Sequence, residues 1–218
     1  MLSERLALIL SEIPQCESFA DVGCDHGIIA EQMLKTGKTA FVNVSDVSKS
    51  SLQKAEKRLY KYLECGKASS VCCDGLSKVP ECECVLIAGM GGEEIIKILS
   101  EAPFLPKKLV LQPMKNTSKV RRFVIDKGYA VKKDYTFKDK KYYDILVLEL
   151  GENMAPYSET EYLFGRDNLK NRTPDFLSYV KKELASAKKY ARSVVSLCDL
   201  ADLNQRVTLL TEVLDGGN

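Results

Sequence analysis

The sequence of 218 residues contains only one histidine, His26, and none of its eight cysteines forms a C-x-x-C pair. The tightest groupings are Cys72-Cys73 and Cys82-x-Cys84. Mixed cysteine–histidine zinc sites need several such ligands at fixed spacing, so this scarcity argues against them. We predict no bound metal and interpret the cysteines as reduced thiols that pack as small hydrophobic residues.

Long apolar runs are also missing from the chain. No stretch approaches the roughly 18 apolar residues that a membrane-spanning helix needs. The apolar run at residues 6–10 is shorter than the core of a usual signal peptide, and Glu4 and Glu12 flank it. One helical stripe there contains Leu2, Leu6, Ile9, Leu10 and Ile13. We therefore expect an amphipathic opening helix, no membrane partner and a cytoplasmic location.

Charge is nearly balanced over the whole chain, with a formal net charge of +2, but it is unevenly distributed. Residues 103–150 carry 12 Lys or Arg against 5 Asp or Glu. Such a segment can present a basic surface to phosphate groups. A solvated set of helix and strand edges explains the same excess equally well. The charge pattern alone therefore does not assign a nucleic-acid partner.

Short apolar runs alternate with helical patterns over residues 18–127. We expect strands at 18–22, 39–44, 68–72, 84–88 and 108–111, with helices near 28–36, after the cap Ser48, near 93–100 and near 117–127. This alternation predicts a parallel sheet with helices on both faces. Two more strands, 129–137 and 142–150, form a hairpin whose last strand runs antiparallel. A seven-stranded, mostly parallel sheet of this kind is typical of the α/β, Rossmann-like class I methyltransferase fold.

The pattern becomes helical after a loop that begins at Gly151. Thr173-Pro174-Asp175 is a strong helix start, with a capping threonine, a proline at the first position and an acid in the first turn. A second apolar stripe at 200–214 has near-heptad spacing, and Cys198-Asp199 is the expected turn before it. We predict a cofactor-binding catalytic domain of residues 1–152 and a helical, coiled-coil-like hairpin of residues 153–218.

The segment 20–27, Ala-Asp-Val-Gly-Cys-Asp-His-Gly, lies between the first expected strand and helix, where nucleotide-like cofactors bind in such folds. Gly23 allows a tight turn and the close approach of a ligand to the backbone. Asp21, at the strand end, suits a cationic partner such as the α-ammonium group of S-adenosylmethionine, and it would repel a pyrophosphate. This acid therefore favours S-adenosylmethionine over a dinucleotide.

Two further acids follow the second and third strands. Asp46 comes 23 residues after Gly23, a spacing suited to binding ribose hydroxyls, and Asp74 can accept a hydrogen bond from an adenine amino group. A helix cap and a turn residue are the respective alternatives. The fourth strand ends in Gly-Met-Gly-Gly at 89–92, which indicates either a ligand close to the backbone or a tight turn. Three acids at the carboxyl ends of three successive strands nevertheless predict one cofactor site.

Taken together, several motifs resemble the bacterial tRNA (adenine(22)-N1)-methyltransferases. They are the 20–27 segment, Cys-Asp-Gly-Leu at 73–76, Ile-Ala-Gly-Met-Gly-Gly at 87–92, Leu-Val-Leu-Gln-Pro at 109–113, Tyr-Asp-Ile-Leu-Val at 143–147 and Phe-Gly at 164–165. The resemblance covers nearly the whole chain. It implies methyl transfer from S-adenosylmethionine to N1 of an adenine in the D-arm region of tRNA. The chain departs from the family at two positions. It has Arg166 where the family often has a proline, and Met114 where the family often has an asparagine.

Carried over position by position, the resemblance implies a set of site residues. The cofactor contacts would be Asp21, Gly23, Asp25, His26, Asp46, Asp74, Gly75, Gly89 and Gly91. The chemistry of methyl transfer, rather than the resemblance, suggests the catalytic candidates. They are the backbone of Gly89 and Met90, the side chains of Gln112 and Asn116 as adenine partners, and His26 as a base or a positioning group. The basic residues themselves, rather than the resemblance, suggest the candidate RNA contacts Lys119, Arg121, Arg122, Lys132 and Lys133, with a solvated face as the alternative.

Two other functions remain open on the sequence. A methyltransferase of a small molecule or a protein would use the same cofactor pocket and would not depend on tRNA. A non-catalytic module that binds S-adenosylmethionine and assembles through its helical hairpin would methylate no RNA. Whichever function applies, we expect a monomer or a weak dimer.

Overall fold

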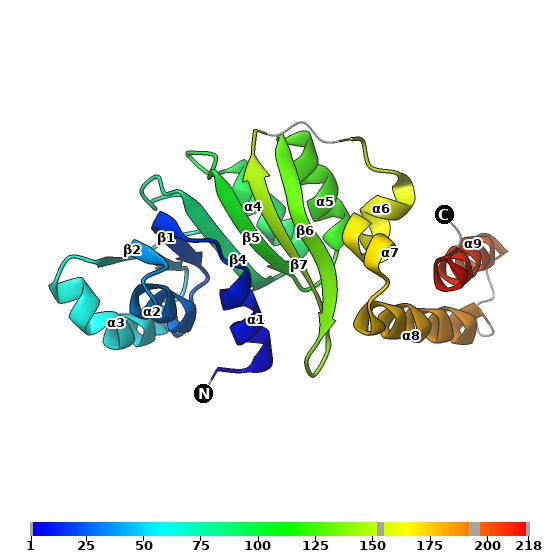
Figure 1. Ribbon diagram of the computed structural model, residues 1–218, viewed down its shortest axis with the longest axis horizontal. Helices are drawn as coiled ribbons and strands as arrows, with labels where there is room; N and C mark the ends of the chain where they lie inside the picture. Colours follow the sequence, from blue (N-terminus) through cyan, green and yellow to red (C-terminus); the bar gives the residue numbers. More distant parts are fainter. Residues whose placement is uncertain (1, 152–154, 192–196, 217–218) are drawn as a thin grey trace.

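The computed structural model describes residues 2–151, 155–191 and 197–216. A twisted seven-stranded sheet forms the centre, helices cover both of its faces, and a further group of helices lies beyond one edge (Figure 1). The strands are β1 (Cys16–Val22), β2 (Thr39–Asp46), β3 (Ala68–Cys72), β4 (Cys84–Met90), β5 (Lys108–Pro113), β6 (Tyr129–Lys138) and β7 (Tyr142–Leu150). The helices are α1 (Glu4–Glu12), α2 (Ile28–Lys35), α3 (Lys49–Glu64), α4 (Gly92–Ser100), α5 (Thr117–Asp126), α6 (Glu159–Phe164), α7 (Arg166–Asn171), α8 (Pro174–Ala191) and α9 (Leu197–Asp215).

The strand order is β3-β2-β1-β4-β5-β7-β6. β3, β2, β1, β4 and β5 pair in parallel, and β7 is antiparallel to both β5 and β6. This arrangement confirms the predicted mostly parallel sheet, closed by a hairpin with an antiparallel strand. The order reverses between β1 and β4, and ligands of open α/β sheets bind outside the carboxyl ends of the strands at such a point.

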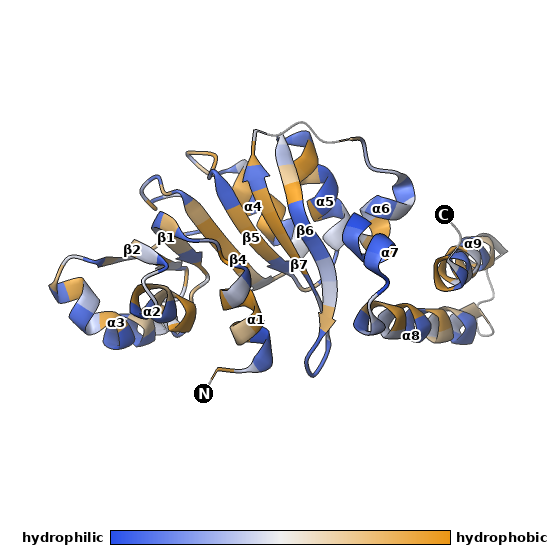
Figure 2. Ribbon diagram, viewed as in Figure 1, coloured by the Kyte–Doolittle hydropathy of each residue, from blue (hydrophilic) through white to orange (hydrophobic). Residues whose placement is uncertain are grey.

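Two apolar layers, one on each face, hold the sheet between its helices. Phe19 belongs to the same apolar cluster as Ile9 of α1 and Leu59 of α3, whereas its neighbour Ala20 belongs to the cluster on the other face, with Ile95 of α4. Successive side chains of a strand point to opposite faces of the sheet. A strand that is buried on both faces therefore has a continuous run of apolar residues in its sequence. Figure 2 shows this as apolar colour along the central strands, with polar colour on the outer side of the helices.

The helix that follows β2 begins where the sequence predicts. The Ser48 side chain accepts a hydrogen bond from the backbone N–H of Ser51 and so caps α3. Its buried residues are Leu52, Ala55 and Leu59, spaced three and four apart on one stripe. This stripe fixes α3 against the sheet and leaves the opposite side of the helix in solvent.

The C-terminal part differs from the prediction in two places. The short helices α6 and α7 occupy a region where we expect a loop, and Gly165 between them has a φ of +87°. The predicted turn at Cys198-Asp199 is wrong, because both residues lie inside α9. The connection before α9 includes residues 192–196, which lie outside the described residues. α8 begins at Pro174, as expected.

The division into two domains at residue 152 stays a prediction. α6 and α7 do not stand apart from the sheet: the backbone N–H of Asp134 in β6 donates to Asp167 of α7, and that of Thr136 donates to Asn168. In the part of the chain that the structure describes, no helix is both long enough and apolar enough to cross a membrane. The same part holds no cluster of three or more His, Cys, Asp or Glu that could bind a metal ion.

Candidate cofactor site and acceptor cleft

A cleft of about 440 Å³ opens at the carboxyl ends of β1, β2 and β4, where the strand order reverses. The structure brings most of the predicted site residues together in it. The predicted residues that line it are Asp21, Gly23, Asp25, His26, Asp46, Asp74, Gly75, Gly89 and Met90. Acids from three separate strand ends therefore share one cavity, because parallel strands present their carboxyl ends along the same edge of the sheet.

Asp21 is the buried acid of this cleft, with only 6% of its surface exposed. Burial raises the pKa of the Asp21 carboxyl to about 7, although a hydrogen bond with the Ala30 backbone lowers it and the charge of Asp46 raises it further. No basic side chain of the described residues forms an ion pair with Asp21. A nearly buried carboxylate without a cationic partner is suited to a positively charged ligand.

The turn after β1 fits closely against the end of β4. Gly23 has a φ of +69°, which favours glycine, and a Cβ built there would lie 2.1 Å from Cε of Met90. The Gly23 N–H donates to the Ser45 carbonyl of β2 at 2.8 Å. Gly23 is therefore favoured by its backbone conformation, whereas the Met90 methyl lies at the end of a flexible side chain and could move away from a Cβ.

Asp46 organises the loop around the cavity. Its Oδ1 accepts from the Ser48 N–H at 2.8 Å, and its Oδ2 accepts from the Asp25 N–H at 3.3 Å. Asp25 has a φ of +45°, and its carboxylate lies 3.7 Å from Nε2 of His26. The carbonyl of His26 accepts from the Arg58 guanidinium. Asp46 thus joins two segments of the cavity wall.

Asp74 lies at the exposed rim of the cleft rather than deep within it. Its Oδ2 forms an ion pair with Nζ of Lys97 at 2.8 Å, and both side chains are more than half exposed. An exposed pair of this kind is weak, about 0–1 kcal/mol, so the carboxylate stays available to another donor. Its contact with an adenine amino group stays a prediction.

Gln112 does not line the cleft, although the sequence predicts it as a partner of the target adenine. The side chain is fully buried. Its Oε1 accepts from Nε of Arg5 at 2.8 Å, and its Nε2 donates to the Pro113 carbonyl at 3.1 Å. Both ends of the amide are engaged inside the protein, so the predicted direct contact with a target base is corrected. Gln112 instead holds Arg5 in place.

Arg5 is the cleft residue that the sequence analysis misses. Its guanidinium lies over the Tyr143 ring, 5.4 Å from the centroid, and a Cβ built on Gly89 would lie 3.0 Å from its Nη2. No carboxylate of the described residues pairs with this guanidinium. The sequence holds a signal for it, since Arg5 stands four residues before the fully buried Ile9 on the same face of α1.

Both ends of α1 are tied to the β6–β7 hairpin. The Arg5 N–H donates to Asp139 in the connecting turn at 3.4 Å. At the other end Glu12 accepts from Tyr135 Oη at 2.7 Å and from Lys133 Nζ at 2.8 Å. These contacts hold α1 against the β6–β7 hairpin and place Arg5 at the cleft.

Asn116 and Gly91 lie outside this cleft lining. Asn116, with a φ of +58°, lines a second cavity of about 680 Å³ together with Tyr142 of β7 and Tyr179 of α8. Gly91 is the cap residue of α4, with an ordinary φ of −67°. Met114 connects the two cavities: it lines the second, and its N–H donates to the Met90 carbonyl of the first at 2.8 Å.

The five predicted RNA contacts all form ion pairs within the protein. Four of them are exposed or partly exposed pairs, namely Lys119–Glu93, Arg122–Glu159, Lys132–Glu149 and Lys133–Glu12. Arg121 is only 1% exposed and is bound by the fully buried Asp134. The prediction that Arg121 contacts phosphate is therefore wrong, because no solvent or ligand reaches its guanidinium.

A family model described as a methyltransferase domain matches residues 2–146, which include every strand up to the middle of β7 and the whole cleft. The chain belongs to this methyltransferase-domain family. Membership agrees with the topology of the sheet and with the position of the acid-lined cleft.

The methyltransferase also resembles individual proteins. A candidate tRNA methyltransferase of Mycoplasma genitalium is 28% identical over 134 residues, which are 59% of this chain and 60% of the length of that relative. A crystal structure of a candidate tRNA (m1A22) methyltransferase of Streptococcus pneumoniae is 25% identical with a TM-score of 0.90, over 98% of this chain and 100% of that one. Its complex with S-adenosyl-L-methionine is 26% identical with a TM-score of 0.88, over the same shares.

Proposed function

We propose that this methyltransferase transfers a methyl group from S-adenosylmethionine to N1 of adenine 22 of tRNA. The observation that carries the proposal is the likeness to the streptococcal m1A22 relative over 98% of this chain, C-terminal helices included. Methyltransferases of other substrates share the sheet, whereas this likeness extends to the part outside it. We place the reaction in the cytoplasm, and the monomer or weak dimer stays a prediction.

The residues of the cleft fit S-adenosylmethionine on their own chemistry. Asp21 is a buried acid without a cationic partner, and it would hold the α-ammonium group. Asp46 would bind the ribose hydroxyls, and Asp74 with Gly75 would border the adenine end. When bound, the cofactor supplies an electrophilic methyl group on a sulfonium.

The main work of the protein is then to bind and align the reactants. Alignment of two reactants can lower a barrier by about 7–11 kcal/mol in favourable cases. Adenine N1 already carries a lone pair, so no residue needs to remove a proton before the attack. N1 lies on the pairing edge of the base, so the adenine has to leave its stack to enter the cleft. His26 and Asp25 lie on the cofactor loop, and we propose a positioning role for His26.

Arg5 is expected to bind an oxyanion near the reacting atoms. Charge-assisted hydrogen bonds contribute about 1.5–3 kcal/mol, so Arg5→Ala should lower kcat/KM about 10-fold or more. Arg5→Lys should restore little, since lysine cannot bond to Gln112 and reach the cleft in the same planar geometry. Steady-state kinetics measures the loss. Calorimetry with the cofactor alone then tells whether the oxyanion belongs to the cofactor or to the RNA.

Cofactor binding should depend on pH through Asp21. A bound cation favours the ionised carboxylate, so the affinity for the cofactor should rise as pH increases through about 7. Below about pH 7, cofactor binding should release one proton from Asp21. The effect on folding has the opposite sign: the folded protein keeps this proton to a higher pH than the unfolded chain does. The contribution of Asp21 to the free energy of unfolding is therefore lost as pH rises from the ordinary pKa of a carboxyl group towards about 7. Calorimetry in buffers of different ionisation enthalpy measures both the affinity and the proton.

The function is tested by incubating the protein with labelled S-adenosylmethionine and unmodified tRNA transcripts and mapping the product nucleoside. We expect 1-methyladenosine at position 22 and none in a transcript with guanine at that position. Methylation at another site would limit the proposal to a general tRNA methyltransferase. The absence of any RNA product, with cofactor bound, would favour a small-molecule or protein substrate or a non-catalytic module.

A further inference from the structure

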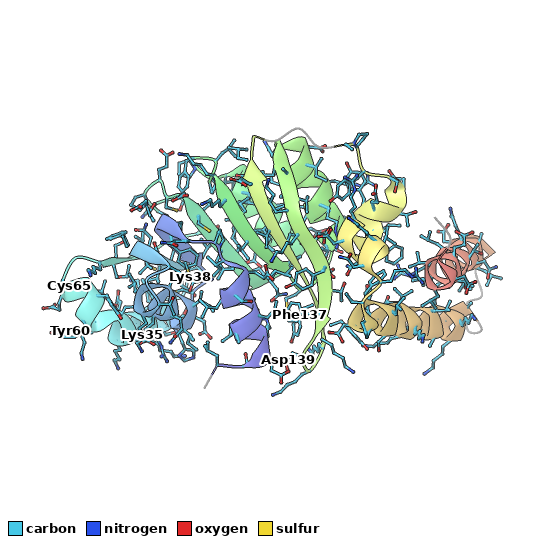
Figure 3. All side chains as sticks on the ribbon, viewed as in Figure 1. Lys35, Lys38, Tyr60, Cys65, Phe137 and Asp139 are labelled. Carbon is cyan, nitrogen blue, oxygen red and sulfur yellow. The ribbon has the colours of Figure 1, made fainter. Side chains whose placement is uncertain are left out.

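The outer side of α3 carries a row of lysines that the cleft does not use. Lys54, Lys57 and Lys61 are exposed and are spaced three and four residues apart, so they share one side of the helix. We call these three residues the α3 lysine face. Lys49 precedes it in the first turn, and Lys67 follows just after the helix. Tyr60, which is 61% exposed, lies at the outer end of the molecule (Figure 3).

These lysines differ from the five predicted RNA contacts of the 103–150 segment in having no acidic partner. Lys119, Arg121, Arg122, Lys132 and Lys133 each form an ion pair with a nearby carboxylate. Within the residues that the structure describes, Lys49, Lys54, Lys57, Lys61 and Lys67 form none. Residues 49–67 contain six basic residues against two acidic ones. Lys107, Lys115, Lys127, Lys138, Lys140 and Lys141 of the 103–150 segment form no ion pair among the described residues either. What distinguishes α3 is that three unpaired, exposed lysines share one side of a single helix.

The position of α3 connects this charge with the cleft. Val47, directly before the helix cap, lines the cleft, so the first turn of α3 begins at its mouth. The 16-residue helix then extends for roughly 24 Å at 1.5 Å per residue. The α3 lysine face occupies roughly 10 Å of this length, from Lys54 to Lys61, which matches a few neighbouring phosphates of a nucleic-acid strand. Figure 1 shows α3 at the end of the molecule opposite α8 and α9.

The chemistry of the face favours RNA over a membrane. The apolar stripe of α3 is buried against the sheet, so the helix has no apolar side left for insertion into lipid. Flexible lysines on a polar helix side are suited to phosphate groups held at the protein surface. Resting on the proposed tRNA substrate, we propose that the α3 lysine face binds the phosphate backbone of the tRNA outside the target nucleotide.

The test measures tRNA affinity directly, by fluorescence anisotropy over a range of salt concentrations. The variant Lys54→Ala/Lys57→Ala/Lys61→Ala should raise Kd about 10-fold or more and reduce the salt slope by about two to three, one for each lost phosphate contact. Its kcat at saturating tRNA and its cofactor affinity should stay unchanged. The matched control Lys78→Ala/Lys107→Ala/Lys127→Ala removes three exposed lysines elsewhere and should change Kd less than twofold.

The outcomes separate this inference from the proposed function. An unchanged Kd in the α3 variant, with wild-type protein that methylates tRNA, overturns the inference alone. An equal loss in the control variant also overturns it, because the effect would then be general charge. Wild-type protein that neither binds nor methylates tRNA overturns both proposals. Loss of binding to anionic phosphatidylserine vesicles, with tRNA affinity retained, would show that the face is made for a membrane surface instead.

Discussion

Asp21→Asn is expected to weaken S-adenosylmethionine binding about 10- to 100-fold, because a charge-assisted contact contributes about 1.5–3 kcal/mol. The asparagine keeps the shape of the side chain and can still bond to the Ala30 backbone, so the cleft should stay intact. Isothermal calorimetry at about pH 8, where wild-type Asp21 is ionised, measures the difference. The pH dependence of binding should disappear in the same variant.

Asp21→Asn should have a different effect on the stability of the ligand-free protein, which it should not lower. Above about pH 7 the wild-type chain holds a buried negative charge, and burial of an uncompensated charge is costly. Removing it should leave the thermal midpoint of the ligand-free variant equal to the wild-type value or higher. The exposed Asp126→Asn serves as the control and should change neither quantity. Full cofactor affinity in a folded Asp21→Asn protein would contradict the assignment of Asp21 to the ammonium group.

Arg121→Ala is expected to destabilise the protein by about 3–5 kcal/mol, since it leaves a buried carboxylate without its partner. Nε and Nη2 of Arg121 bond to the two oxygens of Asp134 at 2.7 and 2.8 Å. Nη1 donates to the carbonyls of Tyr162 and Leu163 at the end of α6. One guanidinium thus joins α5, β6 and α6, and its loss should also loosen the C-terminal helices.

Denaturant unfolding measures this effect, with the neighbouring residue as control. Arg122 pairs with Glu159 at the surface, so Arg122→Ala should cost less than about 1 kcal/mol. The double variant Arg121→Met/Asp134→Leu should recover much of the stability, because it removes both buried charges together. Equal costs for the two single alanine variants would show that the buried network does not stabilise the fold.

Arg121 and Arg122 show where sequence reasoning reaches its limit. The two are adjacent and identical in type, yet one is buried and the other is half exposed. Neighbouring positions of a helix point about 100° apart, so a helix packed on one side can bury the first and expose the second. The partner of Arg121 is Asp134, 13 residues away on β6, and only packing brings it near. The local excess of basic residues consequently predicts an RNA contact at Arg121, although Asp134 occupies its guanidinium in the interior.

The sequence by itself determined the strands, the capped helices and the gathering of Asp21, Asp46 and Asp74 at one edge. Apolar periodicity is a local signal, and the carboxyl ends of parallel strands lie along the same edge of the sheet. Only the tertiary structure decided which charged groups are free. Burial and pairing depend on residues far apart in the chain: Gln112 turns inward to Arg5, and α3 keeps its lysines unpaired. The sequence shows that a charged residue is present, whereas the function of that residue depends on which other residues pack against it.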